Sequence, residues 1–199
     1  MNRRSILAVT GLATVLWLAG FAAIMAFDPK PRLLWNASAS VPIGLYRLHS
    51  ARKPATGDLV AILPPPQLAR FMAERHYLPV GVPMLKRVAA GPGATICRFG
   101  PDVTVGGRLV AAAHDADRYG RPLPVWRGCR DVGVQELFLL NSAPDSFDGR
   151  YYGPIPASGL LGSAQPLLTR DTPAAPLRRR LGCAKLPDSK HASGDKPCR

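Results

Sequence analysis

The sequence opens with an apolar run, residues 5–27, that contains no charged side chain. As a helix with a rise of about 1.5 Å per residue, a run of this length spans a hydrocarbon core of about 30 Å with some tilt. Arg3 and Arg4 precede it, and positive charge on that side favours a cytoplasmic N-terminus. The pattern predicts a single-pass signal anchor of a bacterial inner membrane, with residues 1–4 in the cytoplasm and the chain beyond the anchor in the periplasm.

A cleaved secretory signal peptide is the alternative for this segment. Such a peptide has an apolar region of about 7–15 residues, followed by a cleavage site with small residues. Here the apolar run is longer and ends in Met-Ala-Phe-Asp-Pro at residues 25–29. Lys30 and Arg32 weaken the charge contrast across the run without reversing it. The pattern therefore favours the uncleaved anchor.

Short apolar segments bounded by Gly, Pro and Asp follow the anchor, and they are typical of strands in an antiparallel sheet. Residues 103–110, with Gly106-Gly107 at the centre, have the pattern of a two-residue hairpin. The other strand segments are residues 59–63, 83–90, 136–140 and 160–168. The predicted fold class is mainly β: a coiled, antiparallel, barrel-like sheet behind one N-terminal transmembrane helix.

Turn-forming residues are frequent, with 21 Pro and 19 Gly among 199 residues. This composition fits short strands and turns better than long helices. A short helix is expected over residues 67–77, because Leu68, Phe71 and Met72 would share one of its faces.

Three stretches set the domain boundaries. Residues 29–39 are expected to be an irregular linker at the start of a periplasmic domain over residues 28–170. Residues 171–199 show no apolar periodicity, so we expect them to form a basic, disordered tail.

The formal net charge of +13 brings nucleic acid into consideration as a partner. However, much of the positive charge lies in the last thirty residues and is not interleaved with aromatic residues. A basic tail close to anionic lipid of the inner membrane is the preferred interpretation. No specific nucleic acid is expected, because the folded domain is placed outside the cytoplasm.

Cys97 and Cys129 lie inside the predicted domain, whereas Cys183 and Cys198 lie in the tail. None belongs to a Cys-x-x-Cys motif or a Cys/His array, so a metal site is not expected. In an oxidising compartment a disulfide between Cys97 and Cys129 is favoured, with two buried free thiols as the alternative. Four cysteines allow three pairings, and the sequence does not choose among them.

Ser40 is a candidate nucleophile about a dozen residues beyond the anchor, where it precedes Val41-Pro42. Most serines in loops only form hydrogen bonds within turns. The usual partner of a catalytic serine is histidine, but the four histidines stand in no recognisable triad context, and the chain has no Gly-x-Ser-x-Gly motif. A different base would therefore be required.

Lys86 is the candidate base. Alternation in the strand at residues 83–90 places it on the same face as Met84 and Val88. Burial among apolar neighbours disfavours the ammonium form and lowers a lysine pKa, and a neutral amine can take the proton of a serine hydroxyl. An ordinary exposed Lys-Arg pair with Arg87 is the alternative.

The polar segment at residues 141–154 follows a predicted buried strand. If it stays extended, Asp148 and Arg150 point to the same side and can pair. Ser146 could then form a hydrogen bond to a lysine amine and orient it. A turn-rich loop with capping aspartates fits the same composition equally well.

Taken together, these segments resemble the type I signal peptidases, whose motifs occur in the same order. The segments are Ser40-Val-Pro, Lys86-Arg-Val with Gly91-Pro-Gly, and Asp145-Ser-Phe-Asp-Gly-Arg-Tyr-Tyr-Gly-Pro. Over roughly residues 31–169, the chain is most similar to the conjugative-transfer peptidases of the TraF type. Further similarity to this subgroup lies in Pro64-Pro-Pro, residues 78–88, residues 120–126 and Gly128-Cys-Arg.

The resemblance implies that Ser40 is the nucleophile and Lys86 the general base. It assigns the oxyanion donors to the Ser40 amide and the Ser38 hydroxyl. Ser146 would orient Lys86, and Asp148 with Arg150 would hold the site together. Gly149 stands where many signal peptidases carry a serine. The hydrogen bonding around Asp148 is therefore expected to differ from that of the family.

The function implied is a serine endopeptidase, or transpeptidase, that either cleaves or cleaves and cyclises a secreted conjugative pilin precursor for a type IV secretion system. Other conjugation components would be further partners. No metal or organic cofactor is expected, since a neutral lysine can activate the hydroxyl. A non-catalytic, membrane-spanning component of a secretion apparatus is the rival hypothesis.

Overall fold

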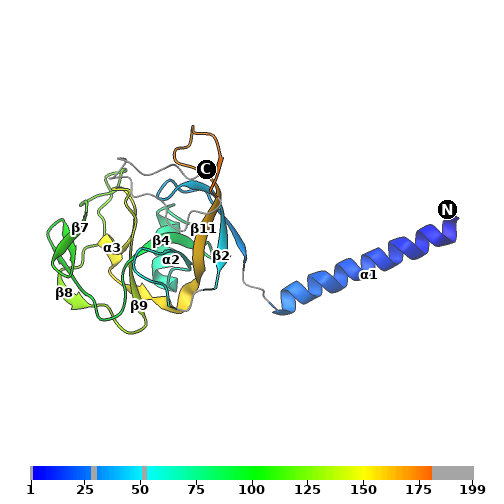
Figure 1. Ribbon diagram of the computed structural model, residues 1–199, viewed down its shortest axis with the longest axis horizontal. Helices are drawn as coiled ribbons and strands as arrows, with labels where there is room; N and C mark the ends of the chain where they lie inside the picture. The colour runs from blue at the N-terminus through cyan, green and yellow to red at the C-terminus, as the bar shows by residue number, and fades with distance from the viewer. Residues whose placement is uncertain (1, 28–30, 51–52, 181–199) are drawn as a thin grey trace. The chain divides into compact units, whose positions relative to one another are not determined.

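The computed structural model describes residues 2–27, 31–50 and 53–180 (Figure 1). The chain forms two compact units, Met1–Pro31 and Arg32–Arg199. Cys183 and Cys198, and most of the predicted tail, lie outside the described residues.

The first unit contains α1 (Arg3–Phe27). Its residues Arg3–Ala26 have a mean hydropathy of 2.0, and the helix is long and apolar enough to cross a membrane. The large apolar side chains described along it are exposed, for example Leu16 and Trp17. One apolar N-terminal helix fits the predicted single-pass anchor, while its orientation stays a prediction.

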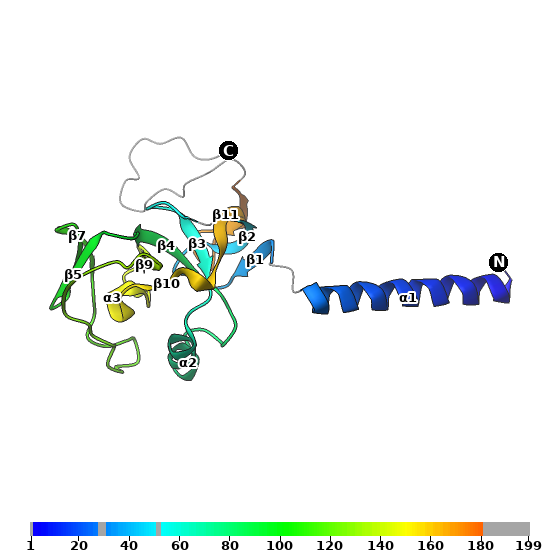
Figure 2. The same cartoon turned by 90° about the horizontal axis from the view of Figure 1, so that it is seen from below.

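The second unit is built on two antiparallel sheets that lie next to each other (Figures 1 and 2). The order of strands in the larger sheet is β1 (Leu33–Asn36), β2 (Ile43–His49), β11 (Leu160–Arg170), β3 (Leu59–Ile62), β4 (Met84–Ala90), β9 (Glu136–Leu140) and β10 (Ile155–Pro156), with β12 (Arg178–Arg179) paired to β11. The smaller sheet has the order β7 (Arg108–Ala112), β6 (Asp102–Val105), β5 (Thr95–Phe99) and β8 (Gly128–Asp131). The predicted mainly β class with one N-terminal helix is confirmed.

The predicted strands and hairpin are present within two residues of their expected ends. Gly106 and Gly107 form the hairpin turn between β6 and β7 with φ of 55° and 78°, a backbone conformation that glycine adopts without strain. Between β3 and β4 lies α2 (Pro66–Glu74), which begins with Pro at its first turn and ends before His76. It is shorter than the predicted 67–77, because His76 has the left-handed φ of 56°.

The strands β2, β5, β8 and β10 were not predicted, and two further strands lie in segments expected to be irregular. The linker over residues 29–39 contains β1, and the stretch beginning at residue 171 contains β12. Asn36 pairs with Gly44 in the first case, and Thr169 pairs with Arg178 in the second. Pairing at a sheet edge relies on backbone hydrogen bonds, so it leaves little apolar alternation for a sequence to reveal.

Apolar side chains pack on both faces of the larger sheet. Val60, Ile62, Met84 and Val88 belong to one buried cluster, together with Met72 of α2. Leu59, Ala61 and Leu85 belong to a cluster on the other face. The alternation predicted for β4 is therefore observed, and α2 covers the face from which Lys86 projects.

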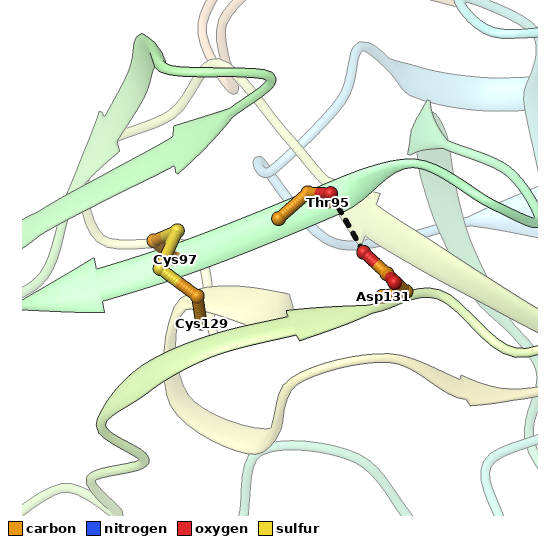
Figure 3. The surroundings of a disulfide bond; sticks show 4 residues. All are labelled: Thr95, Cys97, Cys129 and Asp131. Carbon is orange, nitrogen blue, oxygen red and sulfur yellow. Dashed lines mark hydrogen bonds between the residues drawn. A yellow bond between two sulfur atoms is a disulfide. The ribbon is translucent and has the colours of Figure 1, made fainter.

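The disulfide expected between Cys97 and Cys129 is present in the smaller sheet (Figure 3). The two cysteines are directly opposite each other on β5 and β8. Two residues further along the same pair of strands, Thr95 Oγ1 donates a 2.6 Å hydrogen bond to Asp131. The disulfide and this hydrogen bond both hold β8 against β5.

Candidate active site

Lys86 lies in β4 with 5% of its surface exposed. Burial lowers its pKa to about 8, an effect that nearby Asp148 opposes and Arg150 reinforces. About half of the Lys86 side chains are then neutral at pH 8. The amine is thus available as a proton acceptor close to physiological pH.

Within the described residues, the Lys86 amine has one hydrogen-bond partner. Its Nζ donates to Ser146 Oγ over 2.7 Å, and both side chains are buried. The contact expected between Ser146 and a lysine amine is therefore present. Next to Ser146, the Phe147 ring stacks with Phe71 and Tyr151, each at 5.5 Å between centroids, which fixes the backbone that carries Ser146.

Ser40 lies in the turn between β1 and β2, and Asn36 shapes that turn. Asn36 is buried, and its Nδ2 lies within 3.2 Å of the carbonyl oxygens of Ser38, Val41 and Pro42. Its Oδ1 accepts a hydrogen bond from the Ser38 amide. One side chain thus organises the backbone on both sides of Ser40.

Tyr46 of β2 supports the same turn, because its hydroxyl donates a 2.6 Å hydrogen bond to the Pro42 carbonyl. The sequence analysis missed both Asn36 and Tyr46. An Asn two residues before Ser-x-Ser is typical of a local Asx turn, and this signal was available for Asn36.

The Ser40 hydroxyl is 2.9 Å from the Ser38 hydroxyl, and the Ser40 amide donates to Ser38 Oγ over 3.3 Å. Ser38 therefore stands beside the amide expected to stabilise an oxyanion. A substrate oxygen would replace Ser38 Oγ as the acceptor of that amide hydrogen.

A groove of about 630 Å³ has Ser38, Ser40, Lys86 and Ser146 among its lining residues. Among the described residues no hydrogen bond joins Ser40 to Lys86. The Ser40 hydroxyl is hydrogen-bonded to Ser38, and the Lys86 amine to Ser146. The rest of the groove is lined mainly by apolar side chains, among them Met72, Leu78, Met84 and Phe147. Such a lining is suited to a peptide with small or apolar side chains.

Asp148 and Arg150 pair, but not through the extended backbone that we expected. Asp148 caps α3 (Gly149–Tyr152) and accepts hydrogen bonds from the Arg150 and Asn141 amides at 3.2 and 3.0 Å. Arg150 Nε lies 3.4 Å from the carboxylate. Burial raises the pKa of Asp148, and the positive charges of Lys86 and Arg150 oppose this effect.

The guanidinium of Arg150 also holds the preceding loop, since it donates to the carbonyls of Asn141, Ala143 and Pro144. Asn141 in turn ties this loop to β4, because its Nδ2 donates to the Leu85 carbonyl over 3.1 Å. Asn141 is a further positioning residue that the sequence analysis did not single out.

Gly149 has no space for a side chain. A Cβ there would lie 2.7 Å from both the Leu139 carbonyl oxygen and the Phe138 ring. The carboxylate of Asp148 nevertheless has partners for both oxygens, so its hydrogen bonding does not depend on a serine at position 149. Trp126 Nε1 donates to the Gly149 carbonyl over 3.0 Å and closes the other side of this turn.

A second polar cluster in the groove wall was also missed. Asp117 accepts hydrogen bonds from the Tyr77 hydroxyl at 2.5 Å and from Arg121 Nε at 2.8 Å. Burial raises the Asp117 pKa, but these hydrogen bonds outweigh it, so the net pKa is well below its usual range. The cluster joins the end of α2 to the loop before β8 across one side of the groove. In the described part of the chain, no group of three or more His, Cys, Asp or Glu residues could hold a metal ion.

A family model described as signal peptidase, peptidase S26, matches residues 4–168. The chain belongs to the signal peptidase S26 family. This membership implies a serine peptidase, and the match covers both the apolar helix and the β domain.

Curated relatives of this signal peptidase family member include conjugal transfer proteins. The "Conjugal transfer protein TraF" of Agrobacterium fabrum is 35% identical over 183 residues, covering 86% of this chain and 99% of the relative. A "Plasmid transfer protein TraF" of Escherichia coli is 34% identical over 146 residues, with 67% and 81% covered. The crystal structure of a signal peptidase I from Enterococcus faecalis has 20% identity and a TM-score of 0.36, covering 57% of this chain and 98% of that one. Family membership therefore rests on the sequence matches.

Proposed function

We propose that this protein is a membrane-anchored serine endopeptidase in which Ser40 is the nucleophile and Lys86 the general base. The observation that carries the proposal is that the buried Lys86 amine, with its pKa lowered to about 8, lines the same groove as Ser40. A buried lysine with a depressed pKa, beside a serine in a cleft, is the arrangement that Ser-Lys catalysis requires.

The reaction begins when the Ser40 hydroxyl gives up its hydrogen bond with Ser38 and transfers its proton to neutral Lys86. Ser40 Oγ attacks the scissile carbonyl carbon, and the oxyanion that forms accepts hydrogen bonds from the Ser40 amide and the Ser38 hydroxyl. When the C–N bond breaks, the Lys86 ammonium returns the proton to the leaving amine. This step leaves an ester on Ser40 and a neutral Lys86.

A second nucleophile then resolves the ester, and Lys86 takes its proton and returns it to Ser40 Oγ. If water attacks, the product is a linear, shortened chain. If an amine of the substrate attacks, a new peptide bond forms and no water is consumed. Ser146 holds the lysine through both steps, while Asp148 and Arg150 hold the loop that carries Ser146.

The substrate proposed is a secreted precursor with small residues before the cleaved bond, and specifically a conjugative pilin precursor. The names of the relatives support a role in conjugal transfer. Conjugation components would then be the neighbours of the enzyme in the bacterial inner membrane. The N-terminus would be cytoplasmic and the catalytic domain periplasmic, consistent with Arg3 and Arg4 before the helix.

The decisive experiment is incubation of the purified, full-length protein with candidate pilin precursors, followed by mass spectrometry of the products. The wild-type protein should convert a precursor into a shortened product, and Ser40→Ala should not. A non-catalytic scaffold would tolerate Ser40→Ala in a conjugation assay, and this outcome would refute the peptidase proposal.

A further inference from the structure

Arg98 is a buried cation outside the proposed catalytic machinery. It projects from β5 and is only 2% exposed. Its Nε donates to the Gly100 carbonyl over 3.2 Å, and its Nη1 donates to the carbonyls of Pro124 at 3.3 Å and Arg150 at 2.5 Å. These bonds fix the guanidinium in one orientation.

In the described part of the chain, the charge of Arg98 has no direct acidic partner, although Asp115 acts on it electrostatically. Among the residues that the structure describes, no carboxylate forms an ion pair with it. Its Nη2 has no hydrogen-bond partner within this part of the chain. A buried guanidinium with a free donor retains a strong tendency to bind an anion.

The Arg98 side chain forms part of the lining of a cavity of about 330 Å³. Arg127 adds a second positive charge to the lining, while Asp115 supplies the opposing negative one. His114 lines both this cavity and the groove that contains Ser40 and Lys86, so the two hollows are neighbours. A peptide bound in the groove would therefore lie next to the cavity.

We propose that this cavity is a carboxylate-binding subsite for the substrate peptide, with Arg98 as its principal ligand. The proposal rests on the proposed function, because the neighbouring groove must hold a peptide. The planar fork of a guanidinium matches a carboxylate, and low exposure strengthens such a charge-assisted hydrogen bond. Arg127 strengthens binding from the rim of the cavity, and Asp115 weakens it.

The carboxylate has two possible sources, an acidic side chain and a free chain terminus. Both present the same planar anion to Arg98, and the cavity volume admits either. They are distinguished by two short peptides, one with an internal Asp and an amidated end, the other without acidic side chains but with a free C-terminal carboxylate. An Asn peptide with an amidated end serves as the neutral control for both.

Binding is measured by titration calorimetry on full-length Ser40→Ala protein in detergent micelles at low ionic strength, so that turnover plays no part. We expect at least one carboxylate peptide to bind about tenfold more tightly than the neutral peptide. Preference for Asp identifies a side-chain subsite, and preference for the free terminus identifies a chain-end subsite. Equal binding of all three peptides overturns the proposal.

Variants assign the preference to the cavity. Arg127→Gln should reduce the preference for carboxylate peptides severalfold, and Asp115→Asn should increase it. Arg108→Gln is the control: it removes the same charge from exposed β7 and should leave the preference unchanged. Arg98→Met should abolish the preference, provided that its thermal transition shows a folded protein. A preference that survives both Arg127→Gln and Arg98→Met overturns the proposal. Because binding is read without catalysis, a failure of the peptidase proposal would appear separately, as processing by Ser40→Ala protein.

Discussion

Lys86 and Ser146 are 60 residues apart in the chain, yet the Lys86 Nζ donates a 2.7 Å hydrogen bond to Ser146 Oγ. Both side chains are buried, and each is held by a different element, β4 for the lysine and the loop before α3 for the serine. The hydrogen bond uses one N–H of the amine and leaves the lone pair of the neutral form free. The neutral amine can therefore accept a proton, and we propose that Ser40 supplies it.

Removal of either proposed catalytic residue should abolish processing. Ser40→Ala and Lys86→Ala act on the same proton transfer, so the double variant should lose no more activity than either single one. Lys86→Arg should also be inactive, because a guanidinium is not deprotonated in a protein. Precursor and product are quantified by mass spectrometry, with Lys53→Ala as an exposed control that should retain activity. Turnover by any of the three single variants at position 40 or 86 would contradict the assignment.

Ser146→Ala should lower the rate of processing by about 10- to 100-fold without unfolding the protein, because the lysine loses the partner that orients it. Ser142→Ala provides the matched control on an exposed part of the same loop. Rates are measured under single-turnover conditions, where substrate binding and product release do not obscure the chemical step. An unchanged rate in Ser146→Ala would remove Ser146 from the mechanism.

Processing should depend on pH through the Lys86 titration. Since the neutral amine is the active form and its pKa is lowered to about 8, kcat/KM should rise with pH and level off above about 8. The midpoint is read from kcat/KM between pH 6 and 10. A profile that is flat across this range would show that Lys86 does not titrate as the base.

The same pKa shift makes a prediction for stability. The unfolded chain binds the Lys86 proton up to about pH 10.5, whereas the folded protein releases it at about pH 8. Stability should therefore rise with pH between these values, and the amine should destabilise the fold below pH 8. Lys86→Met should raise the free energy of unfolding at pH 7 by about 1–2 kcal/mol and remove this pH dependence. Urea titrations at pH 7 and 10 test the change in stability and its pH dependence. A Lys86→Met protein that is less stable than wild type at pH 7 would contradict a destabilising effect of the buried amine.

The disulfide and the topology can be tested together by thiol labelling. A membrane-impermeant reagent on intact cells should label Cys97 and Cys129 only after reduction, since the pair is predicted to be periplasmic and oxidised. Replacing both by serine should cost about 2–4 kcal/mol of stability, because the bond closes a loop with a sequence separation of 32. Labelling of Cys97 without reductant would exclude the disulfide, and labelling only in lysed cells would reverse the proposed orientation.

The sequence predicts those parts of the fold that local pattern determines. The apolar run of α1, the alternation of β4 and the Gly-Gly turn after β6 are each encoded within a few neighbouring residues. The edge strands β1 and β12 are not, because their pairing depends on backbone partners elsewhere in the chain. The early end of α2 depends on the positive φ of His76, and the apolar pattern does not predict this backbone conformation.

The candidate site shows the same division. Ser40, Lys86 and Ser146 were predicted because motif order singles them out. Asp117 and Arg98 were not, because their partners, Tyr77 and the Arg150 carbonyl, lie 40 and 52 residues away in the chain. These contacts join segments that are distant in the chain, so only the folded structure reveals them.

The last prediction concerns the ester that Ser40 forms. Water and an amine can each resolve it, and Lys86 can deprotonate either nucleophile. An amine prevails where the groove excludes water and holds the chain end close, since the effective molarity of a well-placed group greatly exceeds that of a free one. The apolar side chains around Ser40 and Lys86 favour such exclusion. We therefore expect a pilin substrate to be joined head to tail. Mass spectrometry distinguishes the outcomes, because the circular product is lighter than the same linear segment by the mass of one water. A linear mature pilin as the only product would leave the peptidase assignment intact and refute cyclisation.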